Sequence, residues 1–302
     1  MQWNSEAIDK ISRGDVRCLA RAISTVENEE EGYYDLLKQI SVNYAIPVIG
    51  VTGPPGAGKS TLLNALLSLL QADKKVAILA VDPTSPFTHG SILGDRLRMS
   101  DYFLHPNIFI RSLATRGSLG GLSSRVLEIT DVLRSSHFDY IFIETVGVGQ
   151  NEIEIAYLAD TTMLVLNPGA GDDVQALKSG ILEIADVFVI NKSDKDNAEV
   201  LHKHLSAMLH LRPASAWNPP IVKTVATENK GLENLLEAIS SHHAFSSNER
   251  RVKLLYHKAI RLITQHKMKG FDAQHLNQQL SEWYGREGFN FYDFLEKNYF
   301  RY

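Results

Sequence analysis

The sequence predicts an α/β protein with a mainly parallel, doubly wound sheet and helical extensions at both ends. Two observations predict this class. Between residues 46 and 244, short apolar, β-branched runs alternate with longer amphipathic stretches, whereas the two end segments show helical spacing without such runs. Strands that alternate with helices form βαβ units, which make a sheet parallel and cover both of its faces.

The expected elements of the sheet region follow from these runs. We expect strands at residues 47–52, 76–81, 108–111, 140–143, 162–166, 187–190 and 221–225. We expect helices among them at residues 59–70, 123–135, 173–184 and 201–211. Each strand is short and almost wholly apolar, which is typical of a strand buried on both faces.

The two ends of the chain are expected to be helical. Apolar residues such as Leu19 and Ile23 recur at helical spacing in the first segment, and residues 245–248 resemble a linker. Residues 249–302 indicate two or three further helices. We therefore divide the chain into an N-terminal helical extension (1–44), a central domain (45–244) and a C-terminal helical arm (245–302). Such an arm docks on its own domain or on a second subunit.

Composition excludes several classes of function. The chain of 302 residues carries 31 Lys and Arg against 35 Asp and Glu, a net charge of -4, so bulk positive charge for nucleic-acid binding is lacking. Cys18 is the single cysteine, which excludes an intrachain disulfide and a multi-cysteine metal cage. No apolar run approaches the roughly 20 residues that span a bilayer, and the first residues do not resemble a signal peptide. We expect a cytoplasmic protein with no membrane segment.

A phosphate-binding loop follows the first strand. Residues 53–60 read Gly-Pro-Pro-Gly-Ala-Gly-Lys-Ser and match the pattern G-x-x-x-x-G-K-S in strand, loop, helix order. Glycines let backbone N–H groups converge on a phosphate, and the helix N-terminus adds partial positive charge. Lys59 would bridge the β- and γ-phosphates, and Ser60 would ligate Mg²⁺. The alternative is a glycine-rich turn without a ligand. The expected nucleotide contacts are Gly53, Pro54, Pro55, Gly56, Ala57, Gly58, Lys59, Ser60 and Thr61.

A tetrapeptide after the strand at 187–190 indicates guanine rather than adenine. Asn191, Lys192 and Asp194 form an N-K-x-D pattern at a strand end, where open parallel sheets bind ligands. The Asp194 carboxylate only accepts hydrogen bonds, so it suits the N1 and N2 donors of guanine. The Lys192 stem can lie over the base, and Asn191 can tie this loop to the phosphate loop. The alternative to a base-binding loop is a turn that caps the following helix and binds no ligand. After the next strand, we expect Val225, Ala226 and Thr227 to bring backbone N–H groups near the guanine carbonyl.

Acidic residues at two other strand ends indicate a metal and water network. Asp82 and Glu144 each close an expected strand at the edge that carries Gly53, where a carboxylate can hold Mg²⁺ through water or orient an attacking water. Asp95 is a third candidate near the metal, and the N–H of Gly147 can contact the γ-phosphate. Each acid could instead be a helix cap or a surface charge. The residues alone do not decide whether Asp82 or Glu144 positions the water.

Several motifs together resemble one family. GPPGAGKST, VDPTSPFTHGSILGDRLRM, ETVGVGQNE, PGAGDDVQALKSGILEIADVFVINKSD and the N-terminal GDVRCLARAISTVEN are similar to the MeaB/ArgK group of GTPases, which includes the methylmalonic aciduria type A protein. The resemblance covers most of residues 13–242. It departs at Val225, where many members have Ser, and at Asp173, where Glu is usual, and it is weakest after residue 245.

The resemblance implies a P-loop NTPase fold of the SIMIBI G-domain type and an Mg²⁺-dependent GTPase that converts GTP to GDP. It further implies a homodimer that chaperones an adenosylcobalamin-dependent acyl-CoA mutase such as methylmalonyl-CoA mutase, with no nucleic-acid or membrane partner. Carried over by position, the metal and water network falls on Ser60, Asp82, Asp95 and Glu144. The switch loops fall on residues 82–99, 144–152 and 169–178.

Two other readings stay open. A nickel- or cobalt-insertion GTPase shares this chemistry but needs soft or imidazole ligands for its cargo, and the pairs His202/His204 and His242/His243 are more typical of surface histidines. A nucleotide-gated binding module would have negligible hydrolysis. The older description of such sequences as an ATPase of lysine/arginine/ornithine transport is hard to reconcile with Asp194.

Overall fold

The computed structural model describes residues 3–82, 96–114, 125–145, 154–169, 181–212, 216–245, 248–286 and 288–300. These residues form two compact units, Met1–Lys258 and Ala259–Tyr302. Within the described part of the first unit, seven strands build one sheet in the order β3-β2-β4-β1-β5-β6-β7, and every neighbouring pair is parallel. The predicted parallel α/β class is confirmed.

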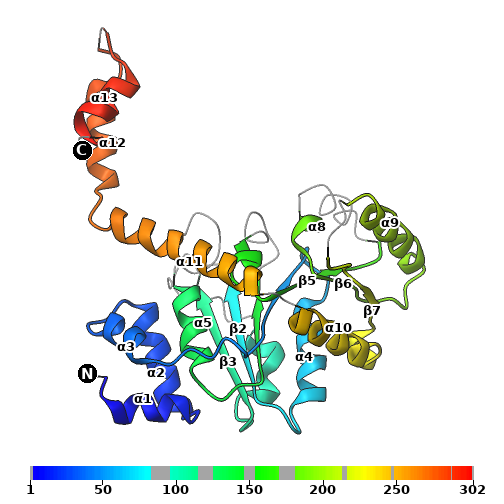
Figure 1. Cartoon of the computed structure of the whole chain (residues 1–302). Helices are drawn as coiled ribbons and strands as arrows, with labels where there is room; N and C mark the ends of the chain where they lie inside the picture. The colour runs from blue at the N-terminus through cyan, green and yellow to red at the C-terminus, as the bar shows by residue number, and fades with distance from the viewer. Residues whose placement is uncertain are drawn as a thin grey trace. The chain divides into compact units, whose positions relative to one another are not determined.

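The strands are short and mostly buried, which fits a parallel sheet covered on both faces (Figure 1). They are β1 (Val48–Thr52), β2 (Val76–Asp82), β3 (Ile108–Ala114), β4 (Tyr140–Glu144), β5 (Thr161–Leu166), β6 (Val187–Ile190) and β7 (Ile221–Lys223). The central strand β1 pairs with β4 on one side and with β5 on the other, with Val51 opposite both Glu144 and Met163. The carboxyl ends of β1, β4, β5 and β6 therefore meet at one edge.

Two apolar layers sandwich the sheet. On one face, β-strand side chains pack with α4 (Lys59–Leu70), α10 (Leu232–Phe245) and the 3₁₀ helix η1 (Arg96–Tyr102). On the other face, they pack with α5 (Val126–Arg134), η2 (Ile155–Tyr157), α8 (Ile181–Ile184) and α9 (Ala198–His210). A further 3₁₀ turn, η3 (Ala226–Glu228), follows β7.

The N-terminal segment adds three helices to the first unit. They are α1 (Ser5–Ser12), α2 (Val16–Glu27) and α3 (Tyr33–Gln39), and their apolar faces join the α5 side of the core. Asn4 and Asp15 cap α1 and α2 by accepting backbone N–H bonds. Arg111 of β3 binds Glu27 at 2.7 Å, which fixes the end of α2 to the edge of the sheet.

In the described residues after 245, three helices follow α10. They are α11 (Asn248–Met268), which crosses the boundary between the two units, α12 (Ala273–Trp283) and α13 (Phe291–Asn298). The second unit has its own aromatic core, because Phe294 is 1% exposed and its ring centroid lies 5.8 Å from that of Trp283. Asp272 and Asn290 cap α12 and α13.

Some boundaries differ from the sequence prediction. The seventh strand ends at Lys223, because the chain turns at Val225, which pairs with Lys230 in an isolated antiparallel bridge. The expected linker is shorter than predicted. Helix α10 runs to Phe245, whose ring packs at 5.3 Å against Trp217, and α11 begins at Asn248. Among the described residues, no helix is long and apolar enough to cross a membrane.

Candidate nucleotide site

The phosphate loop joins β1 to α4 and depends on glycine at two tightly packed positions. Gly53 has a φ of 140°, and a Cβ there would lie 2.1 Å from the carbonyl oxygen of Val165 on β5. Gly58 has a φ of 89°, and a Cβ there would lie 2.5 Å from Asn191 Nδ2. Only a residue without a Cβ lets the loop approach β5 and Asn191 this closely. The loop is therefore held against the two strands that follow β1 in the sheet order.

Lys59 lies under the loop that it follows. Its side chain is 7% exposed, and Nζ donates to the carbonyl oxygens of Gly53 at 2.7 Å and Pro54 at 3.2 Å. A lysine ammonium has three donors and carries a compact charge. It can exchange carbonyl partners for phosphate oxygens without leaving the loop, which is the geometry that a phosphate-bridging lysine requires.

Ser60 and Glu144 place two buried oxygen ligands side by side. The hydroxyl of Ser60 donates to Glu144 Oε1 at 2.7 Å, and each residue is 6% exposed. Serine and carboxylate oxygens are the ligand type that Mg²⁺ prefers, so the pair fits this ion. No group of three or more His, Cys, Asp or Glu that could hold a metal occurs in the described ranges.

The other predicted metal and γ-phosphate residues cannot be placed in the same way. Asp82 ends β2, opposite Ala114 of β3, so its backbone reaches the expected edge, but its side chain lies outside the described atoms. Asp95 and Gly147 lie outside the described residues. Asp82, Asp95 and Gly147 therefore stay predictions from the sequence.

Asn191 joins three loops beneath the candidate base site. It is 1% exposed, and its Nδ2 donates to the carbonyl oxygen of Ala57 at 3.0 Å. Its Oδ1 accepts from the Ala226 N–H and from the Thr224 hydroxyl, both at 3.2 Å. One amide side chain thus links the phosphate loop, the end of β6 and the turn after β7.

The residues near Asn191 in the chain and those after β7 differ in their exposure and contacts. Lys192 adopts a φ of 55°, and its Nζ donates to the Gly56 carbonyl at 2.9 Å, so its stem crosses from β6 to the phosphate loop. Asp194 is exposed, whereas Val225 and Ala226 are buried and Thr227 is exposed. An exposed carboxylate can accept the donors of a purine edge, and the methylene groups of a lysine stem can pack against a base.

Thr224 is a site residue that the sequence does not single out. Its N–H donates to the Ile190 carbonyl at 2.9 Å, and its own carbonyl accepts from the Ser193 N–H at 3.0 Å. It therefore aligns the end of β7 with the N-K-x-D loop, besides binding Asn191 through its hydroxyl. Its position directly before Val225 is the one signal that could have indicated it.

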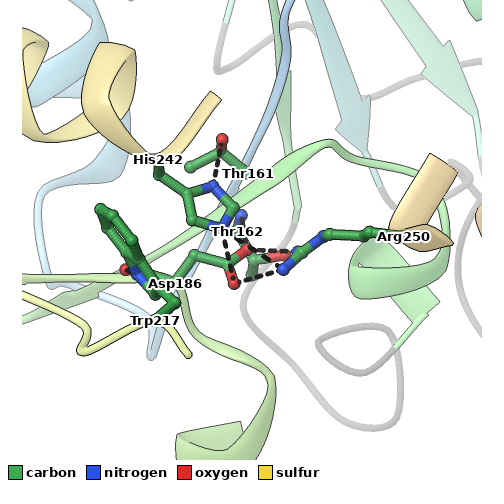
Figure 2. Close-up of polar contacts among 6 residues, drawn as sticks. All are labelled: Thr161, Thr162, Asp186, Trp217, His242 and Arg250. Atoms are coloured by element: carbon green, nitrogen blue, oxygen red, sulfur yellow. Dashed lines mark hydrogen bonds and ion pairs between the residues drawn. The ribbon is translucent and has the colours of Figure 1, made fainter. Parts of the chain in front are cut away.

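A second buried polar cluster lies at the opposite edge of the sheet, where β5 and β6 begin. Figure 2 shows the Asp186 carboxylate between Arg250 of α11 and His242 of α10. Arg250 donates to both carboxylate oxygens, at 2.8 and 2.6 Å, and the His242 Nε2 lies 3.2 Å from Oδ1. The other imidazole nitrogen, Nδ1, lies 2.8 Å from the Thr161 hydroxyl, and the Thr162 N–H donates to Asp186 at 2.8 Å.

This cluster places a hydroxyl, an imidazole and a carboxylate in a row, the order found in nucleophilic catalysis. Thr161 is 0% exposed, His242 1% and Asp186 7%, so no substrate reaches the hydroxyl. Burial would raise the pKa of the Asp186 carboxyl, but hydrogen bonds from His242 and Arg250 and their charges hold its pKa below the usual 3.8. The cluster is a structural ion pair that joins α10 and α11 to the sheet.

Comparison with known proteins decides the family. The family model described as methylmalonyl Co-A mutase-associated GTPase MeaB matches residues 19–274. The chain belongs to the MeaB family. A GTPase of Pyrococcus abyssi is 47% identical over 256 residues, which are 82% of this chain and 78% of that protein. The mitochondrial methylmalonic aciduria type A homolog of Mus musculus is 34% identical over 264 residues, 80% of this chain and 64% of that protein.

A solved structure supports the same fold. The crystal structure of an LAO/AO transport system kinase has a TM-score of 0.66 and 27% identity, covering 91% of this chain and 89% of that one. Membership of the MeaB family makes the chain a GTPase, with GTP as substrate and GDP as product. The phosphate loop, Lys59 and the N-K-x-D loop lie in the part of the chain that the family model matches.

Proposed function

We propose that this MeaB-family GTPase binds GTP with Mg²⁺ at the edge formed by β1, β4 and β6 and uses GTP hydrolysis to assist an adenosylcobalamin-dependent acyl-CoA mutase. The observation that carries the nucleotide site is the Asn191 side chain. It connects Ala57 of the phosphate loop to Ala226 beyond β7 through buried hydrogen bonds of 3.0 and 3.2 Å. A phosphate cradle and a base pocket are thereby built as one unit.

In this proposal, the phosphates bind between the loop amides and Lys59. The N–H groups of the loop that follow its two prolines, residues 56–60, would meet the phosphates where the N-terminus of α4 adds positive partial charge, and the Lys59 ammonium would stabilise the charge that develops on the phosphate oxygens. Ser60 and Glu144 would hold Mg²⁺, directly or through water. The ion would supply neutralising charge to the phosphates. Asp82, Asp95 and Gly147 complete the proposed network from the sequence.

We assign base selection to Asp194, and the Lys192 stem would lie along the base. Near the guanine carbonyl would lie the N–H groups of Val225, Ala226 and Thr227. An adenine edge would present an acceptor to the Asp194 carboxylate, leaving both groups unpaired. This residue explains why GTP rather than ATP is the substrate.

The mutase partner rests on the family description, which names methylmalonyl Co-A mutase. The direct test measures GTP turnover of the pure protein alone and with a purified adenosylcobalamin-dependent acyl-CoA mutase from the same organism. We expect the mutase to change the turnover rate and to bind more tightly in one nucleotide state. If no such mutase changes the GTP turnover rate or binds the protein, the proposed mutase partner is wrong. The assignment of the chain as a GTPase would be unaffected.

A homodimer formed through residues 245–302 completes the proposal. In the second unit, Ile260, Ile263 and Phe291 are 47%, 55% and 46% exposed, although each is large and apolar. Exposed apolar side chains of this kind are typical of an interface. Sedimentation should give twice the chain mass, and Ile263→Glu should lower it to the monomer mass. If Ile263→Glu still sediments with the mass of a dimer, the interface does not involve Ile263.

A further inference from the structure

Two buried threonines connect the phosphate loop to the strand that carries Glu144. Thr52 is the last residue of β1 and precedes Gly53, and Thr145 directly follows β4. The Thr145 hydroxyl lies 3.2 Å from the Thr52 hydroxyl and 3.4 Å from the Val51 carbonyl oxygen. The Thr145 N–H donates to the same carbonyl at 3.0 Å. These contacts extend the link between β1 and β4 one residue beyond the Val51 and Glu144 pair, where the ladder ends.

The hydroxyl pair is sealed from solvent. Thr52 is 0% exposed and Thr145 is 2% exposed, so neither side chain can touch a ligand in the open site. A hydrogen bond between buried hydroxyls is not weakened by competing water, and loss of one partner leaves the other polar group unsatisfied. The pair therefore acts on the backbone positions of the two loops rather than on the nucleotide.

The neighbouring bond between Ser60 and Glu144 cannot serve as a constant link. If Ser60 ligated a cation, its hydroxyl would no longer be available to Glu144, and the carboxylate would need another donor. The two threonines carry no charge and ligate nothing. Their contact does not depend on which partners Ser60 and Glu144 bind.

We propose that Thr52 and Thr145 are positioning residues for GTP hydrolysis. Their hydroxyl pair keeps the backbone at Glu144 at a constant separation from the phosphate loop through the reaction. The inference rests on the proposed nucleotide site. Because GDP binding uses the loop amides, Lys59 and Asp194, the pair contributes to kcat and little to nucleotide affinity.

Thr145→Val tests the proposal because valine keeps the shape and removes the hydroxyl. We expect kcat to fall roughly 3- to 10-fold, the range that losing one hydrogen bond between neutral groups allows, with the Kd for GDP changed less than about twofold. Thr145→Ser, which restores a hydroxyl, should recover most of kcat. Thr52→Val breaks the same hydroxyl pair but keeps the Thr145 contact with the Val51 carbonyl, so it should lower kcat by no more than Thr145→Val does. The double variant should fall no further than Thr145→Val, because the pair is already broken there.

Thr130→Val is the matched control. Thr130 is 2% exposed, and its hydroxyl donates to the Val126 carbonyl at 2.7 Å within α5, away from the site edge. Thr130→Val removes one buried hydroxyl hydrogen bond, as Thr145→Val does, but it should leave kcat unchanged. Melting temperatures of all variants separate a loss of fold from a loss of rate.

Hydrogen exchange gives a readout that needs neither nucleotide nor turnover. In the nucleotide-free protein, the amide of residue 145 should exchange faster in Thr52→Val than in Thr130→Val. Wild-type kcat in Thr145→Val, a kcat loss matched by a loss of GDP affinity, or failure of Thr145→Ser to recover would each overturn the proposal. If the wild type binds no GDP, the proposed site fails first, so the two failures are distinguishable.

Discussion

The Ser60 hydroxyl donates a hydrogen bond of 2.7 Å to the Glu144 carboxylate across a buried gap between α4 and β4. These residues are 84 positions apart in the chain, and the pairing of β1 with β4 brings them together. The contact joins the residue proposed to ligate Mg²⁺ to an acid that can bind its water shell. It makes Glu144 the acid whose position the structure defines, whereas the side chain of Asp82 lies outside the described atoms.

Replacing Glu144 by Gln should lower kcat by roughly 10²-fold, because the amide keeps the size of the side chain but loses the charge that orients water or metal-bound water. The Kd for GDP measured without Mg²⁺ should change less than about threefold. Phosphate release and calorimetry measure the two quantities. Glu237→Gln, an exposed acid on α10, is the control. If Glu144→Gln hydrolyses GTP at the wild-type rate, Glu144 does not position the water, and Asp82 becomes the candidate for that role.

Gly58→Ala and Gly56→Ala form a matched pair in the phosphate loop. Both residues have positive φ, 89° and 77°, so each Ala costs about 1–2 kcal/mol of backbone strain. A Cβ at Gly58 meets Asn191 at 2.5 Å, whereas a Cβ at Gly56 meets nothing within 4 Å. We expect Gly58→Ala to raise the Kd for GDP at least about 10-fold more than Gly56→Ala, as the Asn191 link breaks. Equal effects on GDP affinity would refute a role for that link.

Asp194→Asn should exchange guanine preference for xanthine preference. The new amide presents a donor to the N2 donor of guanine, so the Kd for GDP should rise roughly 10- to 100-fold while that for XDP falls. Because Asp194 is exposed, the free energy of unfolding should stay within about 0.5 kcal/mol of the wild type. Competition binding with GDP, ADP and XDP measures the preference, and Asp196→Asn is the control. Guanine preference that survives the change would remove Asp194 from the base site.

The Asp186 cluster predicts a specific pH dependence of stability. Its folded-state pKa lies below the usual 3.8, so the stability it contributes is complete above that value and is lost as pH falls through the lower folded-state pKa. Asp186→Asn should destabilise the protein by about 1–3 kcal/mol at neutral pH, because the buried His242 and the partly exposed Arg250 lose a charged hydrogen-bond partner. This difference should shrink below about pH 4. Denaturant unfolding across pH, with Asp73→Asn as control, measures it; a difference independent of pH would contradict the ion-pair account.

Local spacing predicts the elements and motifs whose physics is local. The alternation of short apolar runs with amphipathic stretches predicts the parallel sheet, and the helix expected at 59–70 has the observed bounds. The phosphate loop is readable because its glycines, Lys59 and Ser60 are consecutive in the chain. Helix α9 starts at Ala198, three residues before the expected Leu201, since apolar periodicity says little about a helix's first turn.

Contacts between segments that are far apart in the chain cannot be predicted from local sequence patterns. Arg250 and Asp186 are 64 positions apart, and Thr52 and Thr145 are 93 apart. Each of these residues has an ordinary local sequence, and their pairing depends on strand order and on where α11 begins. His242 illustrates the limit: the sequence suggests a surface histidine, but its side chain is 1% exposed between Thr161 and Asp186.

The most direct test of the whole account is a calorimetric titration of GDP into the pure, folded protein with Mg²⁺, repeated with Lys59→Ala. We predict saturable binding of GDP at one site per chain, no competition from ADP, and at least about a 10-fold weaker Kd in the variant, because Lys59 supplies the charge beneath the phosphates. A folded wild-type protein that gives no binding heat for GDP or GTP, or a Lys59→Ala variant that binds and hydrolyses GTP as the wild type does, would contradict it.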